Sequence, residues 1–436
     1  MRSRTLAPRH QPEAALQPPK IAVLGLGYVG LPLALALAKH FDVIGFDISE
    51  TRLRALRAGK DDTGEAESAA LESSTMTYSG DPAALAGCNV FIVTVPTPID
   101  AENRPDLTAV TSASHTVGQA LQPGGIVVFE STVYPGVTED ICGPLIEEIS
   151  GLKCGEDFYL GYSPERMNPG DKAHGVECIT KVVAGQTPDV AAVLRRIYGT
   201  VNGDDIFVAK DIRTAEAAKV IENAQRDINI AFINEVAMIF SKMGLSTHDV
   251  LAAARTKWNF LPFTPGLVGG HCIGVDPFYL SHAAEQHDHH AEVILAGRRI
   301  NDSMAGFLAD RIHAQLQPAS RILVMGLTFK ENVPDLRNSK AADLIFALQR
   351  HGHQVTVIDP IADTDEARAT YGVDSIMSTD GLVGFDCIVG TVPHDAFRQM
   401  SRTALVGLLA PNGLVADIKG IWRDLELPES IRRWNL

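Results

Sequence analysis

The stretch IAVLGLGYVGLPLALALAKH, residues 21–40, decides the fold of the first part of this chain. It begins with an apolar, β-branched run, residues 21–25, which is typical of a buried strand. A glycine-containing turn, GLGYVG, follows directly, and the Leu- and Ala-rich residues after it favour a helix. A second buried strand is predicted over Val43–Phe46 and ends at Asp47. The order strand, glycine turn, helix and strand predicts a β-α-β unit.

The glycine turn lies where a dinucleotide-binding site requires it. Gly25 permits a tight turn, Gly27 lets the backbone approach a pyrophosphate, and Gly30 allows close packing of helix against strand. The helix N-terminus supplies free N–H groups to the phosphates. Asp47, at the end of the second strand, can accept hydrogen bonds from a ribose 2′-hydroxyl and repels a 2′-phosphate, so NAD is expected rather than NADP. Arg52 is expected to pack over the adenine. The alternative is that Arg52 softens the preference for NAD over NADP.

Strands and helices alternate along most of the chain, which indicates parallel sheets with crossover helices. Further strands are predicted over residues 90–95 and 126–129, and one long helix over residues 213–243, which contain no Gly or Pro. Two more helical stretches follow, around 246–254 and 291–315. A second strand-helix-strand pattern comprises residues 322–326, 340–352 and 355–359, with strands at 387–390 and 414–418. It ends at Asp359 as the first ends at Asp47, but it has only Gly326 in place of the full glycine motif.

We therefore predict an α/β fold with two Rossmann-like, doubly wound lobes joined by a long central helix. The expected divisions are a disordered tail (1–19), an N-terminal NAD-binding domain (20–212), a central helical dimerisation domain (213–316) and a C-terminal domain (317–436). The 436 residues suit two or three domains.

Composition excludes several functional classes. The 53 acidic and 38 basic residues give a net charge of -15, which argues against a nucleic-acid partner. No apolar run approaches the ~20 residues of a membrane-spanning helix. Residues 1–20 do not resemble a secretory signal. The six cysteines are dispersed, without a CxxC motif, and are typical of reduced thiols. A soluble, cytoplasmic enzyme is expected, with no membrane partner.

Cys272 is the main candidate for catalysis, because it lies among glycines in PGLVGGHCIGVD, where a thiol can be accessible. With NAD nearby, its thiolate could attack an aldehyde and the adduct could be oxidised to a thioester. Asp276 could be an acid/base or a turn residue. Lys219 and Asn223 share a helix face and could stabilise an oxyanion, although spacing alone favours a solvated face.

Two weaker signals come from the residues alone. Glu165, in YSPERMNPG, could be a general base, although an exposed loop Glu usually has no function. The four histidines at 282, 287, 289 and 290 match no standard zinc spacing, so a polar turn and no metal site are expected. The other five cysteines are expected to be small buried hydrophobes.

Seven blocks of sequence resemble the UDP-glucose/UDP-N-acetylhexosamine 6-dehydrogenase family. They are AVLGLGYVGLPLA (22–34), VPTP (95–98), ESTVYPG (130–136), YSPERMNPG (162–170), EAAKVIENAQRDINIAFINE (216–235), RTKWNFLPFTPGLVGGHCIGVDPFYL (255–280) and GLTFKENVPDLRNS (326–339). The resemblance implies an NAD-dependent, four-electron oxidation of a sugar C6 hydroxyl to a carboxylate.

The resemblance also implies roles for individual residues. Cys272 would be the nucleophile, Lys219 and Asn223 would steady the oxyanion, Asp276 and Thr132 would hold the water, and Glu165 would serve thioester hydrolysis. Cofactor contacts would come from Gly25, Gly27, Tyr28, Val29, Gly30, Asp47, Arg52, Thr94, Thr132 and Arg337. Contacts to the UDP-sugar would come from Glu165, Arg166, Lys219, Asn223, Phe263, Gly266, Gly269 and Lys330, with Arg255 reaching a neighbouring subunit of a homodimer or higher oligomer.

The segment around Cys272 resembles the branch acting on UDP-N-acetylglucosamine or UDP-N-acetylgalactosamine, which includes the Vi-antigen-type enzymes of surface polysaccharide synthesis. Glucose-specific enzymes typically carry a Phe and Pro-Lys-Asp there. UDP-glucose and UDP-N-acetylmannosamine remain alternative substrates. A simple two-electron alcohol dehydrogenase and a catalytically silent nucleotide-sugar sensor are the rival functions.

Overall fold

A computed structural model describes residues 18–166, 175, 177–270 and 273–436. The chain forms two compact units. The first contains the residues up to Glu222 together with Phe278–His289, and the second contains Asn223–Pro277 and His290–Leu436. The boundary falls within a helix, so the division into four segments stays a prediction.

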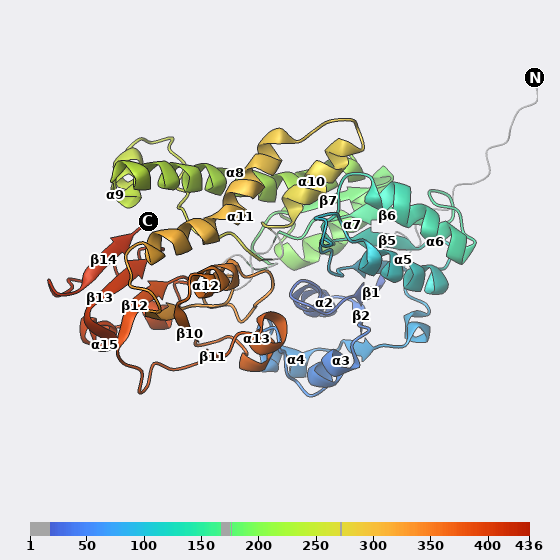
Figure 1. Cartoon of the computed structure of the whole chain (residues 1–436). Helices are drawn as coiled ribbons and strands as arrows, with labels where there is room; N and C mark the ends of the chain where they lie inside the picture. Colours follow the sequence, from blue (N-terminus) through green and yellow to red (C-terminus); the bar gives the residue numbers. More distant parts are fainter. Residues whose placement is uncertain (1–17, 167–174, 176, 271–272) are drawn as a thin grey trace, which may run out of the picture. The chain divides into compact units, whose positions relative to one another are not determined.

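The first unit is built on an eight-stranded sheet in the order β3-β2-β1-β4-β5-β6-β7-β8. Figure 1 labels β1, β2, β5, β6 and β7 of this sheet. Neighbouring strands are parallel except for β6 and β7, which are antiparallel. The strands are β1 (Lys20–Leu24), β2 (Asp42–Phe46), β3 (Thr77–Ser79), β4 (Val90–Val93), β5 (Ile126–Phe129), β6 (Tyr159–Tyr162), β7 (Lys181–Gly185) and β8 (Ile206–Val208).

Helices cover this sheet because their apolar faces pack on the buried strands. Ile21, Val23, Leu31 and Leu37 all lie in one core cluster, which joins β1 to the helix after the glycine turn. The helices are α2 (Gly30–Ala38), α3 (Glu50–Arg57), α4 (Ser68–Ser73), η1 (Pro82–Leu85, 3₁₀), α5 (Thr108–Ala120), η2 (Val137–Cys142, π), α6 (Gly143–Ser150), α7 (Pro188–Asn202) and α10 (Asp276–Glu285).

The second unit contains a six-stranded parallel sheet in the order β11-β10-β9-β12-β13-β14. Its first four positions repeat the 3-2-1-4 order of the first sheet. The strands are β9 (Arg321–Met325), β10 (Gln354–Ile358), β11 (Ser375–Ile376), β12 (Phe385–Gly390), β13 (Leu409–Asp417) and β14 (Arg432–Asn435). The helices are α9 (Thr247–Ala254), α11 (Glu292–His313), α12 (Lys340–Arg350), α13 (Thr364–Tyr371), α14 (Asp395–Arg398) and α15 (Arg402–Gly407).

The long helix α8 (Ile212–Met243) joins the two units and confirms the predicted spine. It ends before Gly244, whose φ of 70° is the left-handed conformation that terminates helices. One face carries buried polar side chains at helical spacing: Glu216, Lys219, Asn223, Asp227 and Asn234. Burying so many polar groups costs free energy unless they are paired, so this face is a candidate for function.

The predicted fold class, two Rossmann-like lobes joined by a long helix, is confirmed. Two local expectations were wrong. Residues 282–290 are not all turn, because residues 282–285 form the last turn of α10. Asp276 is likewise not in a turn but is the first residue of α10. The sequence pattern also lacked the edge strands β11 and β14, which are short and contain few apolar residues.

Candidate active site

The glycine turn has the shape that the sequence predicts. Gly25 has a φ of 96°, which is strained for any residue with a side chain. A Cβ on Gly30 would lie 1.9 Å from the Gly25 carbonyl oxygen and 2.3 Å from Thr94 Oγ1, so only glycine fits there. A Cβ on Gly27 would meet no atom within 4 Å. The backbone is therefore tightly packed at Gly30 and open at Gly27, where a pyrophosphate would approach.

Asp47 and Arg52 are held against this turn. Asp47 accepts hydrogen bonds from Leu26 N and Ser49 N, both 2.8 Å long. The Arg52 Nε donates to the Leu26 carbonyl, and its guanidinium lies 2.7 Å from Asp61. Asp47 stays partly exposed beside the open glycine turn. An open backbone at a helix N-terminus with an acidic residue after β2 fits a dinucleotide with a free ribose 2′-hydroxyl. Tyr28 and Val29 are half-buried at the start of α2.

The second unit repeats this turn with one decisive difference. Gly326 has a φ of 111°, and Thr391 Oγ1 donates to the Met325 and Gly326 carbonyls as Thr94 Oγ1 does to Leu24 and Gly25. Asp359, however, is fully buried and accepts four backbone N–H bonds as well as contacting His394. Burial opposes ionisation, but His394 and the N–H donors lower the Asp359 pKa to about 2. This carboxylate is structural and is closed to a ribose.

Lys219 and Asn223 lie on the buried polar face of α8. Both side chains are buried, so a solvated helix face is wrong for this pair. Asn223 Nδ2 donates to Asp276 Oδ2 over 2.5 Å, which fixes the amide against the N-terminus of α10. The division between the two units falls between Lys219 and Asn223.

Glu165 is buried, which contradicts the expectation of an exposed loop carboxylate. Its Oε2 lies 3.2 Å from Lys181 Nζ, and its Oε1 accepts a bond from the Arg166 backbone N–H. Thr132, three residues after the end of β5, is half-buried in the same unit. The first unit therefore supplies a desolvated carboxylate and a hydroxyl near the carboxyl edge of its sheet.

Two of the sequence blocks meet in the second unit. The Gly270 N–H donates to the Asn338 carbonyl, and Asn338 Nδ2 donates back to the Gly270 carbonyl. A Cβ on Gly269 would lie 2.2 Å from the Asn338 oxygen, and a Cβ on Gly266 would lie 2.3 Å from Lys419 Nζ. These close approaches explain the glycines of PGLVGG, because side chains would separate the two segments.

The Gly266 end of this loop is held by α8. Asn234 donates to the Gly266 carbonyl and accepts from its N–H. Asn234 also donates to Asn301 on α11, which in turn donates to Asp227. The loop is thus fixed to the helix that carries Asn223.

The remaining predicted side chains lie at the surface or partly buried. Arg166 pairs with Glu222, and its NH1 donates to the Thr180 carbonyl. Arg337 forms a bidentate pair with Asp335. Arg255 is exposed and donates to the carbonyl of half-buried Phe263, and Lys330 is half-buried.

Cys272 lies outside the described residues. Of the other cysteines, Cys88, Cys142 and Cys387 are buried as expected, but Cys154 is half-buried and Cys178 is exposed, so the expectation was wrong for these two. Burial raises the pKa of Cys88 to about 11 and that of Cys142 to about 12, which keeps both thiols protonated. Among the described residues, no group of His, Cys, Asp or Glu side chains is arranged to hold a metal ion.

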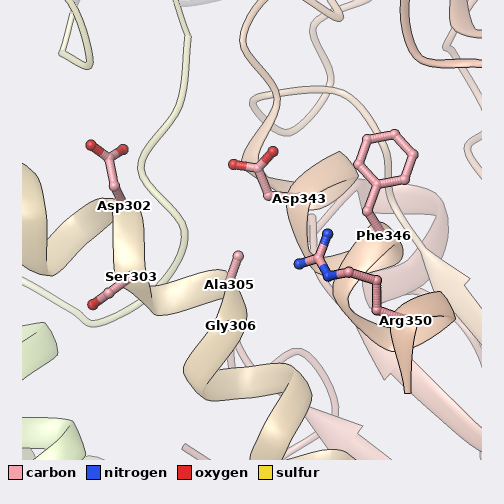
Figure 2. A pocket seen from close by; sticks show the side chains of 7 residues that line it. All are labelled: Asp302, Ser303, Ala305, Gly306, Asp343, Phe346 and Arg350. Atoms are coloured by element: carbon pink, nitrogen blue, oxygen red, sulfur yellow. The ribbon is translucent and has the colours of Figure 1, made fainter.

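Figure 2 shows a cavity of about 300 Å³ between α11 and α12. Asp302 and Asp343 lie on facing helices, and Arg350 extends toward α11. Lys340 pairs with both carboxylates. None of the predicted site residues lines this cavity.

Three side chains of interest were missed at the sequence level. Lys181 contacts both Glu130 and Glu165, and Lys419 approaches Gly266 without an ion pair to a described residue. Burial lowers the pKa of Lys419, although Glu331 opposes the shift. Glu130 immediately follows the end of β5 in ESTVYPG, which was the available signal. No local sequence pattern indicates Lys181 or Lys419, because only the assembly of the sheets brings Lys181 to the carboxylates and Lys419 to Gly266.

The chain matches three models of one family in order. They are the UDP-glucose/GDP-mannose dehydrogenase family's NAD-binding domain over residues 19–202, its central domain over 213–303 and its UDP-binding domain over 323–424. The chain belongs to this family. As a member it is an NAD-dependent nucleotide-sugar dehydrogenase, and the glycine turn and Asp47 lie within the segment that matches the NAD-binding domain.

Individual relatives align over nearly the whole chain. Protein CapL of Staphylococcus aureus is 49% identical over 95% of this chain and 99% of its own. The UDP-N-acetyl-D-glucosamine 6-dehydrogenase of Pseudomonas aeruginosa is 48% identical over 92% of this chain and 96% of its own. A solved structure of UDP-D-ManNAc dehydrogenase from Pyrococcus horikoshii shares 29% identity over 95% of this chain and 98% of its own, with a TM-score of 0.84. The first two relatives support the predicted branch, and the third supports the fold.

Proposed function

We propose that this enzyme oxidises the C6 hydroxyl of a UDP-N-acetylhexosamine, UDP-N-acetylglucosamine or UDP-N-acetylgalactosamine, to the uronic acid. The observation that carries the proposal is the 48% identity over 92% of the chain to a UDP-N-acetyl-D-glucosamine 6-dehydrogenase. The mannosamine enzyme shares the fold at only 29% identity. The product is a charged building block for a surface polysaccharide. UDP-glucose and UDP-N-acetylmannosamine are the alternative substrates.

The chemistry is a four-electron oxidation that proceeds in two stages. NAD, when bound at the glycine turn, would supply the hydride acceptor for both stages. In the first stage Lys219 takes the C6 hydroxyl proton and an aldehyde forms. The Cys272 thiolate then attacks the aldehyde carbon, and oxidation of this adduct leaves a thioester. Asn223, fixed by its bond to Asp276, and Lys219 donate to the oxyanion that develops on C6.

Hydrolysis completes the reaction. Thr132 and Asp276 hold the attacking water, and Glu165 takes its proton. The burial of Glu165 and Lys219 suits these roles, because hydrogen bonds and charges act more strongly where water is excluded. Replacing a described member of this set, for example Glu165→Gln, should slow release of the acid by roughly 10²-fold or more while the thioester still forms.

The UDP moiety requires positive charge in an acidic protein. Lys330 and the loop from Phe263 to Gly269 are the predicted contacts, with Arg166 toward the sugar. Lys419 extends this set, since it approaches Gly266 without an ion pair to a described carboxylate. Lys419→Met should raise the KM for the UDP-sugar by roughly 10-fold with little change in the NAD KM, because one contact to a diphosphate is lost.

We also propose that the enzyme works in the cytoplasm as a homodimer or higher oligomer through α8. Ile221, Phe232, Ile239 and Met243 are exposed at separations of eleven, seven and four residues, which places them on one helix face. No described helix is long and apolar enough to span a bilayer. Phe232→Glu should reduce the mass measured by sedimentation to that of one chain. An unchanged mass would contradict the proposal that α8 forms the interface between subunits.

The deciding experiment compares UDP-N-acetylglucosamine, UDP-N-acetylgalactosamine, UDP-N-acetylmannosamine and UDP-glucose, with NADH counted per sugar consumed. We expect two NADH per sugar and the highest kcat/KM for one of the first two substrates. Equal or faster turnover of UDP-glucose would refute the N-acetylhexosamine assignment. A yield of one NADH per sugar would favour the two-electron alcohol dehydrogenase, and no NADH with any sugar would favour the silent sensor. Cys272→Ser serves as the control, and it should halt the reaction before the thioester.

A further inference from the structure

Glu165 belongs to a cluster of four buried side chains, whose other three members have no role in the reaction described above. It consists of Glu130, Glu165, Lys181 and Tyr198, which we call the Lys181 cluster. Lys181 Nζ lies 2.7 Å from Glu130 Oε2 and 3.2 Å from Glu165 Oε2. The Tyr198 hydroxyl donates to Glu130 Oε1 over 2.5 Å. One lysine therefore joins two carboxylates.

The strand directions bring this cluster to the edge of the sheet where ligands bind. Strands β5 and β6 are parallel neighbours, so Glu130, after β5, and Glu165, after β6, lie at the same carboxyl edge. Strand β7 runs antiparallel to β6, and its first residue, Lys181, returns to that edge. Had β7 been parallel, its first residue would lie at the opposite edge of the sheet.

Burying this cluster costs free energy. All four residues are at most 7% exposed, and one ammonium cannot neutralise two carboxylates. Burial raises the pKa of Glu130, while Lys181 opposes this rise. A buried, incompletely balanced set of charges contributes little stability compared with apolar side chains of similar size. Its position against the proposed base therefore points to the reaction.

We propose that Lys181 and Glu130 are positioning residues that control how readily Glu165 takes the proton of the hydrolytic water. The inference rests on the proposed function. In that step the water oxygen bonds to the thioester carbon, one water proton passes to Glu165, and the carbon–sulfur bond breaks with sulfur leaving as thiolate. The new carboxylic acid then releases its proton to solvent. Lys181 favours the ionised form of Glu165, and Glu130 competes for the same ammonium.

Three other groups near Glu165 have contacts that the structure describes. On its own loop, the Arg166 backbone N–H donates to Glu165 Oε1 at 2.6 Å. The Arg166 guanidinium is paired with Glu222 of α8, so it is already partly neutralised. From α7, Tyr198 contacts Glu130 rather than Glu165. Lys181 is thus the cation that both carboxylates share.

The test is the pH dependence of kcat in Lys181→Met and Glu130→Gln. Without Lys181, Glu165 holds its proton more firmly, so the acid limb should move up by about one pH unit, with roughly a 10- to 100-fold loss of kcat at neutral pH. Without the Glu130 charge, Lys181 pairs with Glu165 alone and favours its ionised form more strongly. The acid limb should therefore move to lower pH. The thioester on the Cys272 peptide should accumulate in Lys181→Met and be detected by mass spectrometry.

The opposite signs separate positioning from a structural role. Arg195→Met, which breaks the exposed pair between Arg195 of α7 and Asp204 just beyond that helix, is the matched control and should leave the profile unchanged. Shifts in the same direction, or none, would overturn the proposal. If Lys181→Met does not fold, Glu130→Gln tests the proposal by itself. A downward shift of its acid limb supports the proposal, and an unchanged pH profile of kcat overturns it. One NADH per sugar in the wild type overturns the proposed function as well, whereas two NADH with unmoved profiles overturns only the roles of Lys181 and Glu130.

Discussion

Gly27 and Gly30, three residues apart in the same turn, should fail for different reasons when each is replaced by alanine. A Cβ on Gly30 would lie 1.9 Å from the Gly25 carbonyl oxygen. Since non-bonded heavy atoms prefer roughly 3.5 Å or more, α2 or the turn must move by about 1.5 Å. That movement disturbs the bond from Thr94 Oγ1 to the Gly25 carbonyl, now 2.7 Å. Gly27 has no such neighbour, because nothing lies within 4 Å of its Cβ position.

The magnitude follows from this geometry. Overpacking of this kind costs about 1–3 kcal/mol. For a unit of about 150–250 residues, 1 kcal/mol lowers the Tm by roughly 2–4 °C, so Gly30→Ala should lose roughly 2–12 °C without any ligand. The free energy of unfolding of Gly27→Ala should lie within about 0.5 kcal/mol of the wild-type value. Its methyl group should instead occupy the approach of the pyrophosphate and weaken NAD binding by roughly 10-fold or more, about 1.4 kcal/mol.

The assay is a thermal melt without cofactor, followed by calorimetric titration with NAD. Gly27→Ala is the matched control for Gly30→Ala, since both add one methyl to the same turn. The reasoning would be refuted if Gly30→Ala melted like the wild type, or if Gly27→Ala lost as much stability as Gly30→Ala. Unchanged NAD affinity in Gly27→Ala would contradict the assignment of its open side to the pyrophosphate.

Three further outcomes follow from buried charges. Asp61→Asn should free the Arg52 guanidinium for a 2′-phosphate and raise the NADP-to-NAD ratio of kcat/KM by roughly 10-fold; an unchanged ratio would contradict this. Burial raises the Glu216 pKa to about 7, so the folded chain keeps a proton that the unfolded chain releases near 4.5. The free energy of unfolding should therefore fall by roughly 3 kcal/mol as the pH rises between these two values. Glu216→Gln should flatten that slope in urea unfolding at pH 5–7, and an unchanged slope would rule Glu216 out. Burial and the neighbouring His313 and His351 lower the His353 pKa, so stability should fall as pH drops below about 6.5, and His353→Gln should reduce that fall.

Much of the fold could be predicted because it depends on local periodicity. The run IAVLG, the glycine turn and the long stretch without Gly or Pro each determine a local backbone conformation, and β1, α2 and α8 follow. The shape of the glycine turn could be predicted for the same reason, since Gly25, Gly27 and Gly30 act through their own backbone. The edge strand β14 could not, because its RRWN sequence has no apolar run and pairs only because β13 offers a free edge.

The sequence by itself therefore determined the turn, the spine and the order of the two lobes, all of which follow from contacts between residues near in the chain. Only the tertiary structure decided which polar side chains lose water. Lys219 and Glu165 look ordinary in their segments, yet both are buried. Lys181 is sixteen residues from Glu165 and fifty-one from Glu130, and it reaches both because β7 reverses direction beside β6. Burial and long-range pairing depend on how sheets assemble, and no local pattern records them.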